Sequence, residues 1–247
     1  MILQQMATAL RQRDWFTVVI ELLIVVLGVF LGLQAQQWSS ERAEARQHAR
    51  YFERLQTDFA AIDARIDGHL SVFKLSIDSL EHVLDLVRLP DEAFEAAEID
   101  EPRLKLALAN LGTTRIPPGR SATYAEMLAL GQLSSIRNDA MRDTLAEYDR
   151  LSAIHLEVFR SASDLMNSQI PITHRHITFD TVPDEGEVSG IRKVVLGYDL
   201  QGMRSDPEFE AALEILEFST RNNQGVRKVE KKLTEEILAL LTAEVRK

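Results

Sequence analysis

The chain has 247 residues, no cysteine and a formal net charge of −10. Its length suffices for one globular domain plus an anchoring segment, and its hydrophobic fraction of 45% is ordinary for a folded chain. The acidic balance argues against nucleic-acid binding, because such proteins displace counterions from phosphate with clustered Lys and Arg. The lack of cysteine excludes disulfides and thiolate metal sites without deciding the compartment.

The N-terminal region is predicted to contain a tail over residues 1–14 and a transmembrane helix over residues 15–38. This second stretch reads WFTVVIELLIVVLGVFLGLQAQQW, an apolar run with an aromatic residue at each end. At ~1.5 Å of rise per residue, Trp15 and Trp38 would lie about 35 Å apart, which matches a hydrocarbon core of roughly 30 Å plus part of each interface. We expect both tryptophans to act as interface anchors in the lipid bilayer.

A cleavable signal peptide is the alternative for this segment, with Arg11 and Arg13 as its charged region. The best small residue at a cleavage position is Ala35, but Leu33 would then stand where a small residue is preferred. Glu21 also interrupts the apolar region. An uncleaved signal-anchor therefore fits the sequence better.

The orientation of the anchor follows from competing charges. Arg42, Arg46 and Arg50 follow the segment, so a count of nearby positive charges slightly favours a cytoplasmic C-terminal side. Long C-terminal domains, however, translocate largely regardless of charge, and a short tail with two arginines is commonly retained inside. We expect a single-pass protein of the bacterial inner membrane with its C-terminal domain in the periplasm.

Four residues of the membrane segment share one helical stripe, because their spacings are 7, 4 and 3: Glu21, Gly28, Gly32 and Ala35. Gly28 and Gly32 form a GxxxG pair, which lets a neighbouring backbone approach closely. The stripe favours a homo-oligomer, the alternative being a face that meets lipid. For Glu21 we expect a structural bond between helices, with an ion or proton site as the alternative.

The helix is predicted to continue out of the membrane, because no proline or glycine falls between Gly32 and Gly68. Residues 39–51 mix charges of both signs and predict a helical stalk. A bundle domain is predicted over residues 52–247. It opens with apolar residues at alternating spacings of 3 and 4, typical of a coiled-coil or long amphipathic helix that ends before Pro90. These residues are Phe52, Leu55, Phe59, Ile62, Ile66, Leu70, Phe73, Ile77, Leu80, Leu84 and Val87.

Shorter and longer helices follow in the bundle domain. Thr123 with Glu126 matches a capping box, and Asn138 is expected to cap a longer helix that Pro171 stops. The buried face of that longer helix is expected to carry Met141, Leu145, Tyr148, Leu151, His155, Val158 and Leu165.

Residues 171–205 lose the helical period and predict an irregular or hairpin excursion, with extended segments at 177–179 and 194–198. A last helix is expected from Pro207, with Gly225 as a point of interruption. Its apolar face is predicted to carry Val226, Val229, Leu233, Ile237, Leu240 and Leu241.

Three stretches of this chain support a resemblance: IELLIVVLGVFLGLQAQQW, TYAEMLALGQLSSIRNDAMRDTLAEYDRL and DPEFEAALEIL. Together they resemble a family of uncharacterised bacterial single-pass membrane proteins of unknown function. The most specific block of the bundle domain contains Tyr124, Gly131, Ile136, Asn138 and Tyr148. The resemblance implies an N-terminal anchor and a helical domain, and it brings no activity to carry over.

The sequence lacks the usual starting motifs of metalloproteases, hydrolases, dinucleotide-binding and nucleotide-binding proteins. The best remaining group is His174, His176 and Asp180, because two histidines in an extended strand would share one face and could bind zinc with the carboxylate. The alternative, which we favour, is that they are solvated surface residues, so no metal or cofactor is expected.

Other histidines and tyrosines of the bundle are expected to be structural. His69, His82 and His155 fall on or beside apolar helix faces, which favours hydrogen-bonded core histidines. Tyr124 and Tyr148 are expected to be core residues whose hydroxyls reach backbone partners, and the alternative is that they line a ligand pocket.

The sequence thus predicts an all-α protein: one transmembrane helix continues into a long amphipathic helix that packs in a helical bundle. Our hypothesis is a membrane-anchored scaffold or partner-binding protein that self-associates and has no catalytic activity. Its expected partners are the bilayer, further copies of the chain and an unidentified protein, and not nucleic acid. Two alternatives stay open: a periplasmic sensory or ligand-binding bundle, and a metal-dependent enzyme that uses the His174 and His176 region.

Overall fold

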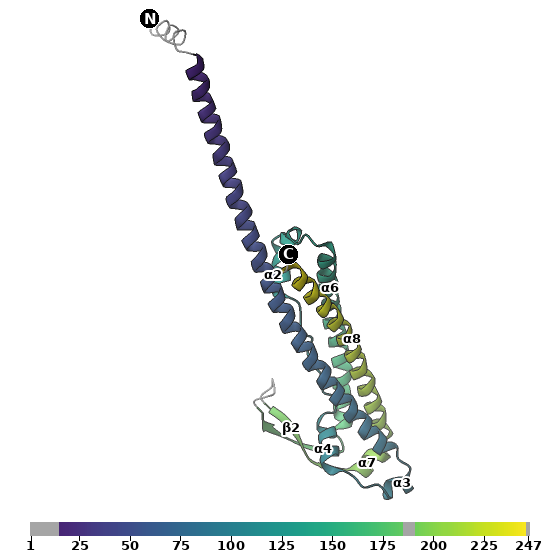
Figure 1. Cartoon of the computed structure of the whole chain (residues 1–247). Coiled ribbons are helices and arrows are strands. Elements are labelled where there is room, and N and C mark those ends of the chain that lie inside the picture. Colours follow the sequence, from purple (N-terminus) through teal and green to yellow (C-terminus); the bar gives the residue numbers. More distant parts are fainter. Residues whose placement is uncertain (1–14, 185–190, 246–247) are drawn as a thin grey trace. The chain divides into compact units, whose positions relative to one another are not determined.

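The computed structural model describes residues 15–184 and 191–245 (Figure 1). The chain divides into two compact units, Met1–Glu53 and Arg54–Lys247, where the sequence predicts a boundary at residue 52. The predicted tail over residues 1–14, with Arg11 and Arg13, lies outside the described residues.

The described chain is helical with one small hairpin, which confirms the all-α prediction. The longest helices are α2 (Trp15–Arg88), α6 (Asp139–Thr173) and α8 (Pro207–Val245). The shorter helices are α3 (Asp91–Glu95), α4 (Glu101–Ala109), α5 (Ala122–Ala129), the 3₁₀ helix η1 (Gln132–Ser135) and α7 (Leu200–Ser205). The hairpin pairs β1 (Ile177–Pro183) with β2 (Ile191–Tyr198) in antiparallel register, Ile177 opposite Tyr198.

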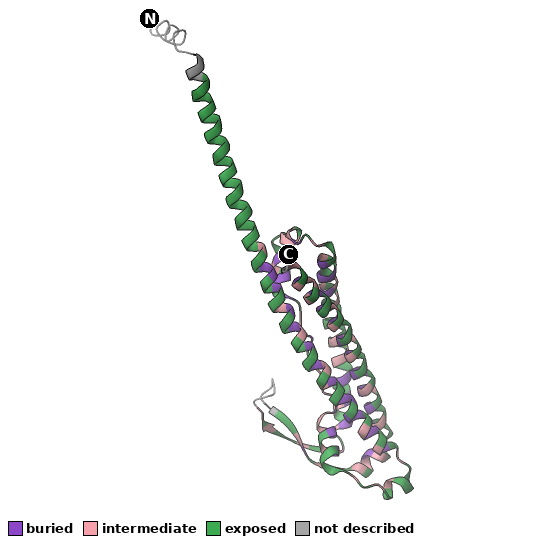
Figure 2. Ribbon diagram, in the orientation of Figure 1, coloured by how far each residue is buried: buried purple, intermediate pink, exposed green. Residues whose placement is uncertain are grey.

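The first unit is, in its described part, the N-terminal segment of α2. Every residue from 19 to 47 is exposed, as the continuous green ribbon of Figure 2 shows. This segment gives α2 a window of mean hydropathy 2.1, so the helix is long and apolar enough to cross a membrane.

The second unit is built on three helices: the C-terminal part of α2, α6 and α8. Two ion pairs show that α2 and α8 run in opposite directions. Arg88 pairs with Glu210 at 2.7 Å, whereas Lys231 pairs with Asp63 at 2.9 Å. Thr144, near the start of α6, bonds to Glu236, near the end of α8, so α6 and α8 are antiparallel as well.

The apolar core lies at the end of the bundle where α4, α7 and the hairpin pack against the long helices. Its largest members include Leu80, Leu104, Met203, Phe209 and Leu213, all fully buried. Each such side chain stabilises the fold by about 1.5 to 3 kcal/mol. Ile177 of β1 and Val195 of β2 belong to the same cluster, which fixes the hairpin beside α4.

The heptad pattern of α2 is confirmed with one exception. From Leu55 on, all predicted core positions are buried except Leu70, which is half-buried. The neighbouring His69 takes the buried position instead, because the 3 and 4 spacing runs through Ile66, His69 and Phe73.

Pro171 does not stop α6, which continues to Thr173. The prediction was wrong because the proline lies in the last turn, where its missing N–H removes one hydrogen bond while the following amides still pair. The backbone N–H of His174 donates to the carbonyl of Ile170 at 2.9 Å. Gly225 likewise lies inside the uninterrupted helix α8.

An extended segment, residues 113–121, connects α4 to α5. Gly112 and Gly119 have φ of 72° and 88°, a backbone region that favours glycine. The predicted capping box at Thr123 is wrong, since Ser121 is the N-cap of α5 and accepts from the Tyr124 N–H at 3.1 Å. Asp58 of α2 accepts from Ser121 Oγ at 2.8 Å, which ties the start of α5 to α2.

Candidate functional site

The face that α8 turns into the bundle has a polar centre. Its buried positions follow spacings of 3 and 4, as in a heptad seam: Leu213, Leu216, Thr220, Asn223, Arg227, Glu230, Thr234, Ile237 and Leu241. The five central residues of this seam are polar or charged, and none is more than 3% exposed. We call Thr220, Asn223, Arg227, Glu230 and Thr234 the polar seam.

This seam corrects the face predicted for α8. Val229 is 47% exposed and Val226 and Leu233 are only half-buried, whereas Ile237 and Leu241 are buried as expected. The face predicted for α6 needs a similar correction, because Val158 and Leu165 are exposed and Leu151 is half-buried. The sequence signal that was missed is the alternating spacing of 3 and 4 that begins at Leu213 and Leu216. Continued along α8, this spacing leads to Arg227 and Glu230.

A buried ionic cluster occupies the middle of the polar seam. Arg227 Nη1 donates to Glu230 Oε2, and Glu230 Oε1 lies 2.7 Å from His155 Nδ1 on α6. Arg227 is 1% exposed and Glu230 is fully buried. Such an arrangement satisfies both carboxylate oxygens, which a buried carboxylate requires.

Two titratable side chains of the other helices, His69 and Tyr148, interact with the charges of this cluster. Burial lowers the pKa of His69 on α2 to about 4, and the charges of Arg227 and Arg115 act in the same direction. Burial also raises the pKa of the Tyr148 phenol, assisted by the charge of Glu230. His69 and Tyr148 are therefore uncharged at neutral pH.

Three polar atoms around the cluster are buried without a hydrogen-bond partner among the described residues: Arg227 Nε, Asn223 Nδ2 and His69 Nδ1. Each unsatisfied group costs about 1 to 3 kcal/mol. The polar seam is therefore a costly part of the bundle core.

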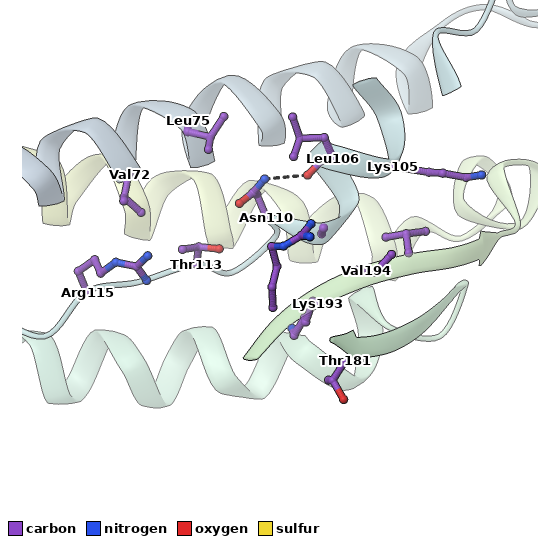
Figure 3. A pocket seen from close by; sticks show the side chains of 13 residues that line it. Val72, Leu75, Lys105, Leu106, Asn110, Thr113, Arg115, Thr181, Lys193 and Val194 are labelled. Atoms are coloured by element: carbon purple, nitrogen blue, oxygen red, sulfur yellow. Dashed lines mark hydrogen bonds between the residues drawn. The ribbon is translucent and has the colours of Figure 1, made fainter. Parts of the chain in front are cut away.

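A pocket of about 650 Å³ lies between α2, α4 and the hairpin (Figure 3). Val72 and Leu75 of α2 lie along one wall, Leu106 and Asn110 stand beside them, and the two strands form the opposite wall. The full lining is Val72, Leu75, Lys105, Leu106, Ala109, Asn110, Thr113, Arg115, Thr181, Arg192, Lys193, Val194 and Val195.

The candidate metal ligands do not form a joint site. His174 and His176 lie in the turn between α6 and β1, and not in a strand that would align them. His176 Nε2 bonds to Asp206 at 2.9 Å and lowers the pKa of that carboxyl, whereas the ring of His174 packs on Phe179. Asp180 is exposed and accepts from the Thr181 N–H. Among the described residues no group of three metal-binding side chains gathers.

The remaining predicted residues of the bundle lie in structural positions. Tyr148 donates to the carbonyl of Gly119 at 3.0 Å, and Tyr124 and Ile136 are buried. Gly131 has φ of 67° at the end of α5, and Asn138 caps α6 by accepting from the Met141 N–H at 3.2 Å.

Two other histidines differ from expectation in their bonding. His69 is buried with Nδ1 unpaired, and His82 is half-buried with Nε2 unpaired among the described residues. His155 makes the core hydrogen bond that the sequence predicts, to Glu230.

The membrane-helix stripe of Glu21, Gly28, Gly32 and Ala35 is exposed along its length. A Cβ added at Gly28 or Gly32 would meet nothing within 4 Å. The Arg42 guanidinium lies 3.5 Å above the Trp38 ring, while the side chain of Trp15 lies outside the described residues.

Comparison of the chain with known protein families, curated proteins and solved structures finds no match. The resemblance of the chain to a family of single-pass membrane proteins stays a prediction.

Proposed function

We propose that this protein is a membrane-anchored helical scaffold or partner-binding protein that self-associates through its N-terminal helix and has no catalytic activity. One observation carries the proposal: residues 19–47 are exposed throughout, although they include the most apolar stretch of the chain. A contiguous apolar surface of this length marks an interaction with lipid or with another protein. Lipid on most of the helix and a second copy on the small-residue face would cover it.

The stripe of Glu21, Gly28, Gly32 and Ala35 supports the second copy. Neither glycine has a neighbouring atom that would resist a closer helix. Two backbones that approach along such a face gain van der Waals contact that lipid chains do not replace. A carboxyl on the same face adds a hydrogen-bonding group, which is worth about 0.6 to 2 kcal/mol between membrane helices.

The test compares Gly28→Leu with Val29→Leu by chemical crosslinking of the full chain in native membranes. Gly28→Leu adds bulk on the stripe and should reduce dimer formation, because it holds the backbones apart. Val29→Leu adds bulk one residue round the helix and should leave association nearly unchanged. A monomeric wild type, or equal behaviour of the two variants, would refute self-association through this face.

For the location, our proposal is a single pass through a bacterial inner membrane with the C-terminal domain in the periplasm. Support comes from Arg11 and Arg13, two positive charges just before the apolar segment, which favour retention of that side of the membrane helix inside. An alkaline phosphatase fused after Lys247 should be active, and a green fluorescent protein at the same point should be dark. The opposite pair of results would place the domain in the cytoplasm.

A further inference from the structure

The pocket beside α2 has apolar lining residues that are exposed to solvent. Leu75 is 45% exposed and Leu106 is 55% exposed, although both line the same depression with Val72 and Val194. Its volume of about 650 Å³ is of the size that small-molecule sites have, commonly about 300 to 1,000 Å³. These walls offer an apolar ligand more burial than a flat surface would.

The polar lining of the pocket is one-sided in charge. No described Asp or Glu contributes to the lining. Four cationic side chains do: Lys105, Arg115, Arg192 and Lys193. In a chain with net charge −10, this local excess of positive charge runs against the overall balance. In Figure 3, Arg115 and Lys105 lie toward opposite ends of the depression, with Lys193 on the strand wall.

Two of the pocket cations form ion pairs that solvent weakens. Lys105 pairs with Glu101 at 3.4 Å and Arg192 with Asp184 at 3.1 Å, and the side chains of both pairs remain partly exposed. Lys193 lies 3.4 Å from His174 Nε2 and 5.3 Å from the Phe179 ring centre, and no described carboxylate pairs with it. Desolvation lowers the pKa of both Lys193 and His174.

We propose that this pocket binds a small amphipathic organic anion, whose acidic group lies at Lys193 and whose apolar body covers Leu75 and Leu106. Charge complementarity selects the anion, because the described lining offers it donors and no repelling carboxylate. The exposed leucines select the apolar body, because covering them removes apolar surface from water. The inference concerns the bundle domain alone and does not depend on how the membrane helix associates.

The test measures binding of octanoate to the full chain in nanodiscs of zwitterionic lipid, with empty nanodiscs as the blank. We expect saturable binding at one site per chain by isothermal titration calorimetry. Octan-1-ol and octylammonium keep the apolar body without the negative charge, and inorganic phosphate keeps the charge without the body. Each of these three probes should bind at least tenfold more weakly than octanoate.

Two variants assign the binding to the pocket. Lys193→Gln removes a cation and Leu106→Gln removes apolar surface, and each should weaken octanoate binding at least tenfold. The matched control is Lys228→Gln on α8, an exposed lysine outside the pocket that bonds only locally, to Gln224 among the described residues. Circular dichroism of each variant verifies that the helices are retained.

A different pattern would overturn the proposal. Equal octanoate binding by empty nanodiscs would place octanoate in the lipid. Equal binding by Lys193→Gln, Leu106→Gln and the control Lys228→Gln would place it outside the pocket. Binding of octan-1-ol as tight as that of octanoate would show an apolar depression without anion recognition.

Discussion

At the scale of single residues, the buried cluster of Arg227, Glu230 and His155 is the most costly feature of the bundle. Charged side chains that are buried together lose hydration that their mutual attraction only partly restores. The described structure nevertheless gives Glu230 a partner on each oxygen. Removing one charged partner of the cluster should therefore lower the free energy of unfolding more than removing both partners.

The first prediction concerns Arg227→Met, which leaves the Glu230 carboxylate buried with only His155 beside it. We expect the free energy of unfolding to fall by about 3 to 5 kcal/mol. The double variant Arg227→Met with Glu230→Leu should lose less, because no carboxylate is then left buried. Chemical unfolding of the full chain in detergent, followed by circular dichroism, measures both values.

Lys228→Met provides the control for this series, because Lys228 is exposed on the same helix. It should change stability by less than about 0.5 kcal/mol. A double variant that is as unstable as the single one would contradict the account of a strained buried carboxylate.

The second prediction concerns the pH dependence of stability through His69. Its pKa is about 4 in the folded chain and 6.5 in the reference state, so the unfolded chain takes up the proton first as pH falls. Stability is therefore fully present above pH 6.5 and is lost as the pH falls toward 4, by up to about 1.4 kcal/mol per pH unit. His82 and His174 act in the same direction, because burial lowers both pKa values.

His69→Gln should flatten this dependence between pH 6.5 and pH 4, because glutamine does not titrate. His48→Gln, outside the bundle unit, is the matched control and should keep the full slope. Thermal unfolding of the full chain at several pH values measures the slopes. Equal slopes in wild type and His69→Gln would contradict a buried neutral His69.

At the scale of elements, the sequence predicts those helices whose buried face is apolar. The long α2 was predictable because its heptad pattern from Leu55 to Val87 is nearly all Leu, Ile, Val and Phe. The face of α8 was not predictable by hydropathy, because its central heptad positions are Asn223, Arg227 and Glu230. Choosing apolar residues at helical spacing selects Val226 and Val229 instead, and each of them lies one position before a residue of the buried seam.

The ends of elements were predictable only where one local interaction decides them. Asn138 caps α6 as expected, since its side chain oxygen accepts a first-turn N–H. Pro171 failed as a stop signal because a proline in the last turn costs one hydrogen bond, which the packing of α6 outweighs. The extended segments at 177–179 and 194–198 were correct in position, and both strands are longer than predicted.

The pocket of the bundle could not be found from the sequence. The pocket joins α2, α4 and a hairpin, so its residues are as far apart as Val72 and Val195. The cationic lining is invisible in a chain whose charge is acidic overall, because only folding gathers Lys105 with Lys193. Local motifs predict only chemistry that lies within one segment of the chain, whereas the residues of this pocket come from several segments.

At the scale of the whole molecule, the central claim is an anchor that also assembles. The composition of residues 15–38 predicts the anchor, and the exposure of residues 19–47 agrees with it. Assembly rests on the small-residue stripe, which distinguishes one side of a helix that is apolar on every side. A measurement that resolves sides of this helix tests the claim most directly.

The absence of cysteine makes that measurement clean, because each single-cysteine variant carries one thiol. With about 100° between successive residues, Ile24 and Ala35 lie toward the stripe, while Val26 and Leu33 lie on the opposite side at matching depths. Mild oxidation in native membranes should give disulfide-linked dimers for Ile24→Cys and Ala35→Cys, and few for Val26→Cys and Leu33→Cys. Equal crosslinking on both sides, or no dimer from any variant, would contradict a scaffold that assembles through this helix.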